Sequence, residues 1–300
     1  MITVIGSINL DLIATVDRLP KPGETVPGSG FTTAAGGKGA NQALAAARAG
    51  SGVRMIGAVG ADAFADAALA LLDEGGVDLS GVARAGEPTG TALILVGGDG
   101  ENMIAVVPGA NGAVGTAAVD AIAFRKGEHL LLQHEIPLAT VERALDAARR
   151  AGAVSILNTA PFRAEAAAFL ERADVVIANE TEFDLYADAL ALEGVGRAER
   201  MRDFSTRTGR TIIVTLGGDG VVAATPGGVV RAEALRVVPV DTVGAGDTFC
   251  GYLAAGLAAG LPLPGAMRRA AVAGSLACLK QGAQPSIPFA ADVDAALATS

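Results

Sequence analysis

Hydrophobic and polar residues form two different periodic patterns along the 300-residue chain. Short runs rich in valine, isoleucine and leucine are typical of buried strands, and the stretches between them repeat apolar residues every three or four positions, as one-sided helices do. The strands expected in the main body are 2–6, 53–59, 129–133, 154–158, 174–179, 211–215, 220–224 and 228–231. The expected helices are one that opens within 36–41 and ends at 48, then 62–74, 138–150, 164–172, a helical region ending near 208, 247–260, 264–280 and 290–298. This alternation predicts an α/β fold with a mainly parallel sheet covered by helices on both faces.

A second group of apolar segments predicts a smaller sheet separate from the main body. Its expected strands are 12–16, 24–33, 91–96 and 101–107. The last two flank Gly97, Gly98, Asp99 and Gly100, which is a hairpin signal. No internal repeat or long linker interrupts the chain, so we expect a single domain over residues 1–300.

Polar residues gather where the expected strands end. Singly, each is most simply a helix cap or a turn residue, but in open α/β sheets the carboxyl edge of the strands is where ligands bind. Their shared position therefore favours a binding site at that edge. These residues are Asn9, Asp11, Glu135, Asn158, Asn179, Glu182 and Thr215.

The stretch DTVGAGDTFCG, residues 241–251, carries the clearest chemistry. Gly244, Ala245 and Gly246 have at most a methyl side chain, so a ligand can approach their N–H groups closely. A helical pattern follows from Asp247, and a glycine turn at a helix N-terminus is typical of an anion site. A carboxylate beside a bound phosphate has a use if it accepts a proton from an attacking hydroxyl. The alternative is an ordinary loop in which Asp247 is the helix N-cap.

Composition narrows the class of partner. The net charge is −9 and no basic stripe is present, which argues against nucleic acid and against an anionic membrane. The uncharged stretch Thr248–Met267 is about long enough to span a bilayer, but it is mostly alanine and glycine and contains Pro262 and Pro264, so a buried helix is favoured. We expect Cys250 and Cys278 to be buried free thiols in a reducing compartment.

Several nucleotide and hydrolase motifs are missing. A Walker A loop is excluded because Gly39 follows Lys38, where serine or threonine is required. GDGVVA, residues 218–223, lies between two strands and does not open a helix, which removes most of the case for a dinucleotide-binding oxidoreductase. A structural role is favoured for His129 and His134 because no third metal ligand is nearby, and no G-x-S-x-G elbow is present.

Taken together, these motifs resemble the ribokinase-like (PfkB) carbohydrate kinases along essentially the whole chain. GSINLD (6–11), GGKGANQA (36–43), ENMIAVVPGAN (101–111), NTAP (158–161), NETE (179–182), TLGGDG (215–220), DTVGAGDTFCG and KQGAQPS (280–286) occur in the family's order. The resemblance implies a three-layer sandwich with a small β-sheet lid, formed by segments about 10–35 and 88–108, that is often also a dimer interface. Thr159 stands where many members have proline.

The resemblance also implies roles for individual residues. Asp247 would be the general base, and the amides of Gly244, Ala245 and Gly246 would form the anion hole. The sugar would be bound by Asn9, Asp11, Gly37, Lys38, Gly39, Asn41, Glu135 and Asp247. ATP would be bound by Asn179, Thr215, Leu216, Gly217, Gly218, Gly220 and Gly246. Glu182 would hold Mg²⁺ through water, and a monovalent cation, K⁺, would be held by Asp241, Val243, Ala277, Lys280, Gly282 and Ser286.

The expected activity is ATP-dependent phosphorylation of the 5-hydroxyl of D-ribose by a cytoplasmic homodimer. GSINLD, GGKGANQA and GAQPS most resemble the members that act on ribose. An alternative keeps the chemistry but changes the acceptor to deoxyribose, fructose or another ketose or hexose, or a nucleoside. A nucleoside would need an apolar slot, and Phe31 is the single aromatic residue in the expected lid segments. A non-catalytic sugar sensor is the third alternative, and the intact Asp247 and anion hole argue against it.

Overall fold

The computed structural model describes residues 1–299, so Ser300, the last residue of the expected single domain, lies outside them. Within those residues a nine-stranded sheet has the order β13-β12-β11-β10-β9-β8-β1-β4-β5, and it is parallel except at β12 and β13. Its strands are β1 (Ile2–Ile5), β4 (Val53–Gly60), β5 (Asp78–Ala85), β8 (His129–Leu132), β9 (Val154–Asn158), β10 (Val175–Asn179), β11 (Thr211–Thr215), β12 (Val221–Thr225) and β13 (Gly228–Ala232). The expected mainly parallel sheet is confirmed.

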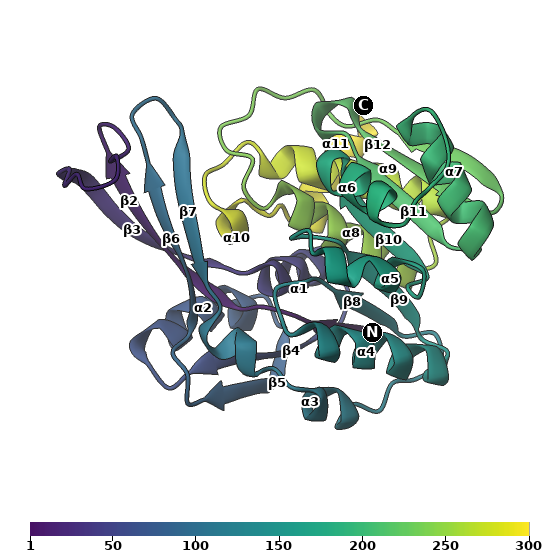
Figure 1. Ribbon diagram of the computed structural model, residues 1–300, viewed down its shortest axis with the longest axis horizontal. Helices are drawn as coiled ribbons and strands as arrows, with labels where there is room; N and C mark the ends of the chain where they lie inside the picture. The colour runs from purple at the N-terminus through teal and green to yellow at the C-terminus, as the bar shows by residue number, and fades with distance from the viewer. Residues whose placement is uncertain (300) are drawn as a thin grey trace.

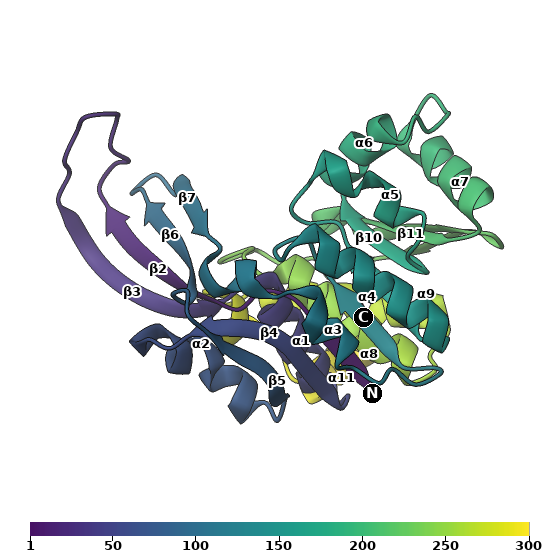
Figure 2. The ribbon, with the colours of Figure 1, turned by 60° about the horizontal axis from the view of Figure 1, so that its bottom comes forward.

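Helices cover both faces of this sheet (Figures 1 and 2). One core layer contains buried residues of α1 (Lys38–Arg48), α2 (Ala63–Glu74), α8 (Ala245–Ala258), α9 (Leu263–Ala277) and α11 (Ala290–Ala298). The other contains those of α3 (Thr116–Asp120), α4 (Leu138–Ala151), α5 (Ala167–Leu170), α6 (Glu180–Ala189) and α7 (Arg197–Thr208). Alternate residues of a strand face opposite layers, as Val4 and Ile5 of β1 do.

A four-stranded sheet of order β3-β2-β6-β7 extends from one side of the molecule (Figures 1 and 2). Its strands are β2 (Asn9–Val16), β3 (Gly28–Gly36), β6 (Gly90–Val96) and β7 (Asn102–Val107). Since only three residues separate the end of β1 at Ile5 from the start of β2 at Asn9, the small sheet starts directly at the carboxyl edge of the main sheet. Residues at the base of β2 are therefore placed beside that edge.

Helices α1 and α8 pack unusually closely, and small residues allow it. A side chain at Gly251 of α8 would meet the Gln42 carbonyl and the Ala45 methyl of α1 at 2.5 Å. Glycine and alanine at this crossing let the two backbones approach. The first turn of α8, with Asp247, is thereby brought against the first turns of α1, where Asn41 and Gln42 lie.

The structure also differs from the sequence expectation in several elements. The edge strand β5 and the helix α3 were not predicted, because β5 is largely exposed without a strong apolar alternation and α3 has only five residues. Residues 164–172 form a 3₁₀ turn, Ala164–Ala166, followed by the four-residue α5, and not one helix. Helix α8 ends at Ala258 and α9 begins at Leu263, and no helix within residues 1–299 is long and apolar enough to cross a membrane.

Candidate active site

Asp247 lies at the centre of the site, and the residue is 9% exposed. Its Oδ2 accepts a hydrogen bond from Asn41 Nδ2 at 2.9 Å, and its Oδ1 accepts one from Gln42 Nε2 at 2.8 Å. Burying a carboxylate is costly unless charge-assisted hydrogen bonds compensate it. These two amides of α1 supply that compensation.

The turn that precedes Asp247 is held open by glycine. Gly244 has φ of 77°, in the left-handed region, and a side chain there would meet Ala283 at 2.9 Å. Nothing lies within 4 Å of the position that a side chain on Gly246 would take, so this residue faces open space. Helix α8 begins at Ala245, and no side chain caps it. The N-cap alternative for Asp247 is therefore wrong, because Gly244 is the N-cap and Asp247 is the third residue of the helix.

A cation and several carboxylates surround the space beside Asp247. The carboxylate of Asp247 is the main influence on Lys38, and together with Glu135 and Glu182 it raises the pKa of Lys38 despite burial. Lys38 therefore stays charged among these three acids. Glu135 Oε2 accepts hydrogen bonds from Ser7 Oγ at 2.5 Å and from the Lys38 N–H at 3.1 Å.

The base of the small sheet contributes Asn9 and Asp11. Asn9 Oδ1 accepts from Asn111 Nδ2 at 2.7 Å, and Asn111 also bonds both backbone groups of Ile8, at 2.8 and 3.1 Å. Burial first, and the charge of Glu135 second, raise the pKa of Asp11 from 3.8 to about 6. Two acidic groups that repel each other in a partly buried space are typical of a binding site.

Two glycines of the GGKG segment are required by close contacts with the first strand and the turn after it. Gly37 has φ of 89°, and a side chain on it would meet the Asn9 N–H at 2.8 Å. A side chain on Gly39 would meet the backbone of Gly6 at 2.6 Å, and its own N–H donates to Ser7 Oγ at 3.3 Å. These contacts bring residues 37–41 against residues 6–11.

A cleft of about 750 Å³ begins on the other side of the glycine turn. Ala245, Gly246 and Phe249 form one wall. Four other expected nucleotide residues also line the cleft, namely Thr215, Gly217, Gly218 and Gly220, whereas Asn179 does not. Leu216 does not line the cleft; its N–H donates to the Gly220 carbonyl at 2.8 Å and closes the turn.

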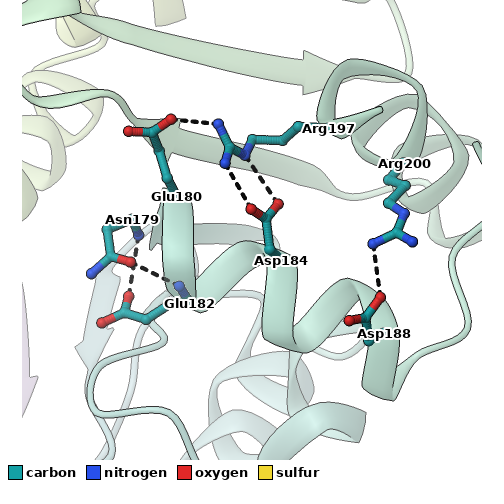
Figure 3. Close-up of polar contacts among 7 residues, drawn as sticks. All are labelled: Asn179, Glu180, Glu182, Asp184, Asp188, Arg197 and Arg200. Carbon is teal, nitrogen blue, oxygen red and sulfur yellow. Dashed lines mark hydrogen bonds and ion pairs between the residues drawn. The ribbon is translucent and has the colours of Figure 1, made fainter. Parts of the chain in front are cut away.

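Asn179 and Glu182 open helix α6 as a reciprocal cap (Figure 3). The Glu182 N–H donates to Asn179 Oδ1 at 2.8 Å, and the Asn179 N–H donates to Glu182 Oε2 at 3.1 Å. Thr159, the residue that departs from the family pattern, also donates to Glu182 Oε2, at 3.1 Å. Since the other Glu182 oxygen has no protein donor among these contacts, it suits a water-mediated role toward a hydrated Mg²⁺.

The expected monovalent-cation residues meet at the loop after α9. Asp241 accepts from the N–H groups of Val243 at 3.0 Å and Gly282 at 2.9 Å, so it joins the glycine turn to this loop. Ser286 Oγ donates to the Ala283 carbonyl at 2.8 Å. Ala277 is buried at the end of α9, while Lys280 is exposed. Carbonyls and a carboxylate are the donor set that a hard cation prefers.

Several residues of the site were not singled out from the sequence. Ser7, Gln42, Asn111 and Gln133 are buried polar side chains that hold other site residues through hydrogen bonds. The motifs GSINLD, GGKGANQA and PGAN contain the first three, and that was the available signal. Cys278 is not buried as expected: it caps α9, lines the cleft and is part-exposed.

Comparisons with known proteins agree with this geometry. The model of the pfkB family carbohydrate kinases matches residues 1–290. The chain is 37% identical over 300 residues to a ribokinase of Lactococcus lactis subsp. lactis, covering 99% of this chain and 96% of that protein. It is similar to the crystal structure of a ribokinase from Thermotoga maritima, with a TM-score of 0.91, 31% identity and 99% of each chain covered. A ribokinase from Arabidopsis thaliana complexed with ribose and ATP has a TM-score of 0.86 at 31% identity, with 100% of this chain and 99% of that chain covered. The expected three-layer fold is confirmed.

The raised pKa of Asp11 predicts how stability depends on pH. Asp11 gains a proton near pH 6 in the folded protein but only near its ordinary value of 3.8 when unfolded, so its contribution to stability is present below about pH 4 and lost as the pH rises through 6. Asn at this position does not titrate. As the pH rises from 4 to 7.5, the unfolding free energy of Asp11→Asn should therefore increase by about 1–3 kcal/mol relative to that of the unchanged protein. Urea unfolding of both proteins across this range measures the gain. Parallel curves would show that Asp11 titrates normally.

Proposed function

The chain belongs to the pfkB family of carbohydrate kinases, and on that premise we propose that it transfers the γ-phosphate of ATP to the 5-hydroxyl of D-ribose. The position of the Asp247 carboxylate carries this proposal: it is buried at the end of an open glycine turn, between a nucleotide-sized cleft and a pocket of sugar-type hydrogen-bonding groups. The relatives named ribokinase, which match nearly the whole chain, support ribose as the acceptor.

Asp247 acts as the general base in this reaction. As the sugar hydroxyl oxygen forms its bond to the γ-phosphorus, its proton passes to a carboxylate oxygen of Asp247, and the bond to the β-phosphate oxygen breaks to release ADP. The N–H groups of Gly244, Ala245 and Gly246 lie where a helix N-terminus favours negative charge, so they stabilise the charge that develops on the phosphoryl oxygens. The Ala245 N–H donates a long hydrogen bond to the Thr242 carbonyl, 3.3 Å, which it exchanges for a phosphoryl oxygen.

The sugar lies between the small sheet and α1. Asn9 and Asp11 approach it from β2, Gly37, Lys38, Gly39 and Asn41 from the start of α1, and Glu135 from the end of β8. Carboxylates and amides suit an acceptor with several adjacent hydroxyls because each can accept or donate more than one hydrogen bond. Ser7 holds one Glu135 oxygen and leaves the other for the sugar.

ATP occupies the cleft beside the glycine turn. Thr215, Gly217, Gly218 and Gly220 contact the nucleotide, and Leu216 closes the 216–220 turn that carries these glycines. Asn179, the N-cap of α6, does not line the cleft, and we assign it to the phosphates through its place beside Glu182. When bound, Mg²⁺ neutralises charge on the phosphates, and Glu182 orients its water ligands. The carboxylates of Asp247, Glu135 and Glu182 explain why a cation between the protein and the phosphates is needed.

A monovalent cation, K⁺, binds next to the glycine turn. Asp241, Val243, Ala277, Lys280, Gly282 and Ser286 surround the site, Lys280 through its backbone because its side chain is exposed. The hydrogen bond from Gly282 to Asp241 and the contact of Ala283 with Gly244 join this loop to the anion hole. An ion held there orders the turn that presents the amides.

Residues 1–300 act as one kinase domain whose lid consists of segments about 10–35 and 88–108, and two copies pair through the lid. The small sheet exposes neighbouring large apolar side chains on its edge strand β7, where Ile104 at 54% and Val106 at 53% lie two residues apart and so on the same face. Contiguous exposed apolar residues of this kind mark interaction surfaces. We place the enzyme in the cytoplasm, where ATP is made and thiols such as Cys250 stay reduced.

A coupled kinase assay over pentoses, hexoses and nucleosides tests the proposed function. D-ribose should give the highest kcat/KM of the panel, by a factor of roughly 10 or more, which is about 1.4 kcal/mol of transition-state discrimination. Preference for deoxyribose, a ketose or a nucleoside would overturn ribose but leave the kinase, and turnover of none of them would favour the sugar-sensing alternative.

Asp247→Asn links that activity to this site. The variant keeps the size of the side chain and does not remove a helix cap, so we expect it to fold. Since an amide cannot take the proton, kcat should fall by roughly 10²–10⁴, while sugar affinity changes much less. Normal turnover by a folded Asp247→Asn protein would show that the carboxylate is structural.

Potassium should raise the activity of the enzyme at fixed Mg²⁺. The rate in K⁺ should exceed the rate in an equal concentration of tetramethylammonium several-fold, because the ordered turn presents the amides in advance of the reaction. Asp241→Asn, which cannot accept both N–H groups, should weaken this response. Equal rates in the two salts would contradict a monovalent-cation site.

The lid interface predicts a dimer in sedimentation at micromolar concentration. Ile104→Glu places a charge on the exposed edge strand β7 and should shift the protein to monomers. Val229→Glu is the matched control, because Val229 is 43% exposed on β13, at the far edge of the main sheet, and this variant should stay dimeric. A monomeric unchanged protein, or a dimer disrupted by Val229→Glu alone, would rule out the lid as the interface.

A further inference from the structure

Gln42 is a fully buried polar side chain at the centre of the site, with 0% exposure. It lies next to Asn41 on α1, yet it faces the interior of the protein. Its Nε2 donates to Asp247 Oδ1 at 2.8 Å and to Asn158 Oδ1 at 3.2 Å, and its Oε1 accepts from Gln133 Nε2 at 2.6 Å. Both donor positions and the oxygen of the Gln42 amide are thus engaged by side chains of the site.

The surroundings fix which way the Gln42 amide points. Gln133 donates to its oxygen from β8's carboxyl end, so its nitrogen must face Asp247 and Asn158. Asn158 in turn donates its Nδ2 to the Ile177 carbonyl at 3.3 Å, which turns its oxygen toward Gln42. Gly6 leaves the room for Gln133, since a side chain there would come within 2.1 Å of Gln133 Oε1.

The two amides that hold Asp247 differ in what else they can reach. Asn41 is 5% exposed, and its buried Oδ1 has no partner among residues 1–299, so this oxygen is free to accept from a substrate hydroxyl. Gln42 has no exposed surface and cannot touch a substrate. When the sugar engages Asn41, Gln42 is the donor that still holds the carboxylate.

We propose that Gln42 is a positioning residue of the phosphoryl transfer, with Gln133 holding it in turn. This inference rests on the proposed function of Asp247 as the general base. The amide of Gln42 keeps Oδ1 on the protein side and so fixes the plane of the carboxylate toward the incoming hydroxyl. A misplacement of about 1 Å in a reacting group costs roughly 10² in rate, so a fixed carboxylate plane matters for kcat.

Gln42→Met is the first test, because methionine has nearly the same length and cannot donate a hydrogen bond. We expect kcat to fall by about 10–10² and the KM for ribose to change by less than about 3-fold, since Gln42 does not contact the sugar. An unchanged kcat, or a KM that rises as much as kcat falls, would overturn the proposal.

Combining Gln42→Met with Asp247→Asn shows whether Gln42 acts through the Asp247 carboxylate or only stabilises the fold. If Gln42 acts through the carboxylate, Gln42→Met should change the residual kcat of Asp247→Asn by no more than about 2-fold, because residues that act as a unit are not additive. A further 10-fold loss in this background would show that Gln42 only supports the fold.

Gln133→Met gives a second route that does not touch Asp247, in case Gln42→Met fails to fold. It should lower kcat by about 3–10-fold, and it should add nothing to Gln42→Met in the double variant. Thr140→Val is the matched stability control: it removes a buried hydrogen bond to the Val114 carbonyl, 2.7 Å long, on α4. It should lower the melting temperature similarly and leave kcat unchanged. A Gln133→Met enzyme with normal kcat would also overturn the proposal.

Assays of the unchanged protein separate a failure of the proposed kinase function from a failure of the positioning role of Gln42. If it phosphorylates no acceptor of the panel, the proposed function fails. If it is active and loses that activity on Asp247→Asn, but Gln42→Met and Gln133→Met keep full kcat, the positioning inference alone fails.

Discussion

A buried carboxylate needs hydrogen-bond donors, and in this protein those donors come from a part of the chain that is distant in sequence. Asp247 lies in the first turn of α8, and the amides that compensate its charge lie on α1, 206 and 205 residues earlier in the chain. The small residues at the α1–α8 crossing are what make the distance short enough for hydrogen bonds. Leaving such a charge without its donors would cost several kcal/mol, so packing and chemistry constrain the same few residues.

The remaining features of the site follow from where the strands end. Three residues connect β1 to β2, so the small sheet begins beside the sugar pocket, and β11 leads into the 216–220 turn, whose glycines line the nucleotide cleft. Lys38 lies among Asp247, Glu135 and Glu182, and its charge balances acids that would otherwise repel one another and an anionic substrate. Sugar, phosphate and cation sites are therefore coupled electrostatically over a short distance.

The strand and helix alternation, the glycine turn and the carboxyl-edge residues were predictable because each depends on local pattern. The role of Gln42 was not, since a glutamine inside a helix is usually solvated and only the packing of α8 shows that it is buried. For the same reason Asn111 and Gln133 were missed: their partners, Asn9 and Gln42, are distant in sequence. Asp247 was expected to open α8, but glycine at 244 moves the helix start two residues earlier. Edge strand β5 has no strong alternation, so its pairing with β4 decides its structure.

The order of the chain has a consequence for biosynthesis. The ribosome makes α1, with Asn41 and Gln42, before it makes Asp247, and the 206 residues between them take on the order of 10–40 s at typical translation rates. During that time the side-chain amides of Asn41 and Gln42 have no carboxylate to bind, and the face of α1 that α8 will cover is open. A nascent chain that stops before α8 therefore lacks both the base and the helix that covers α1, and chaperones or proteases would meet it in that form.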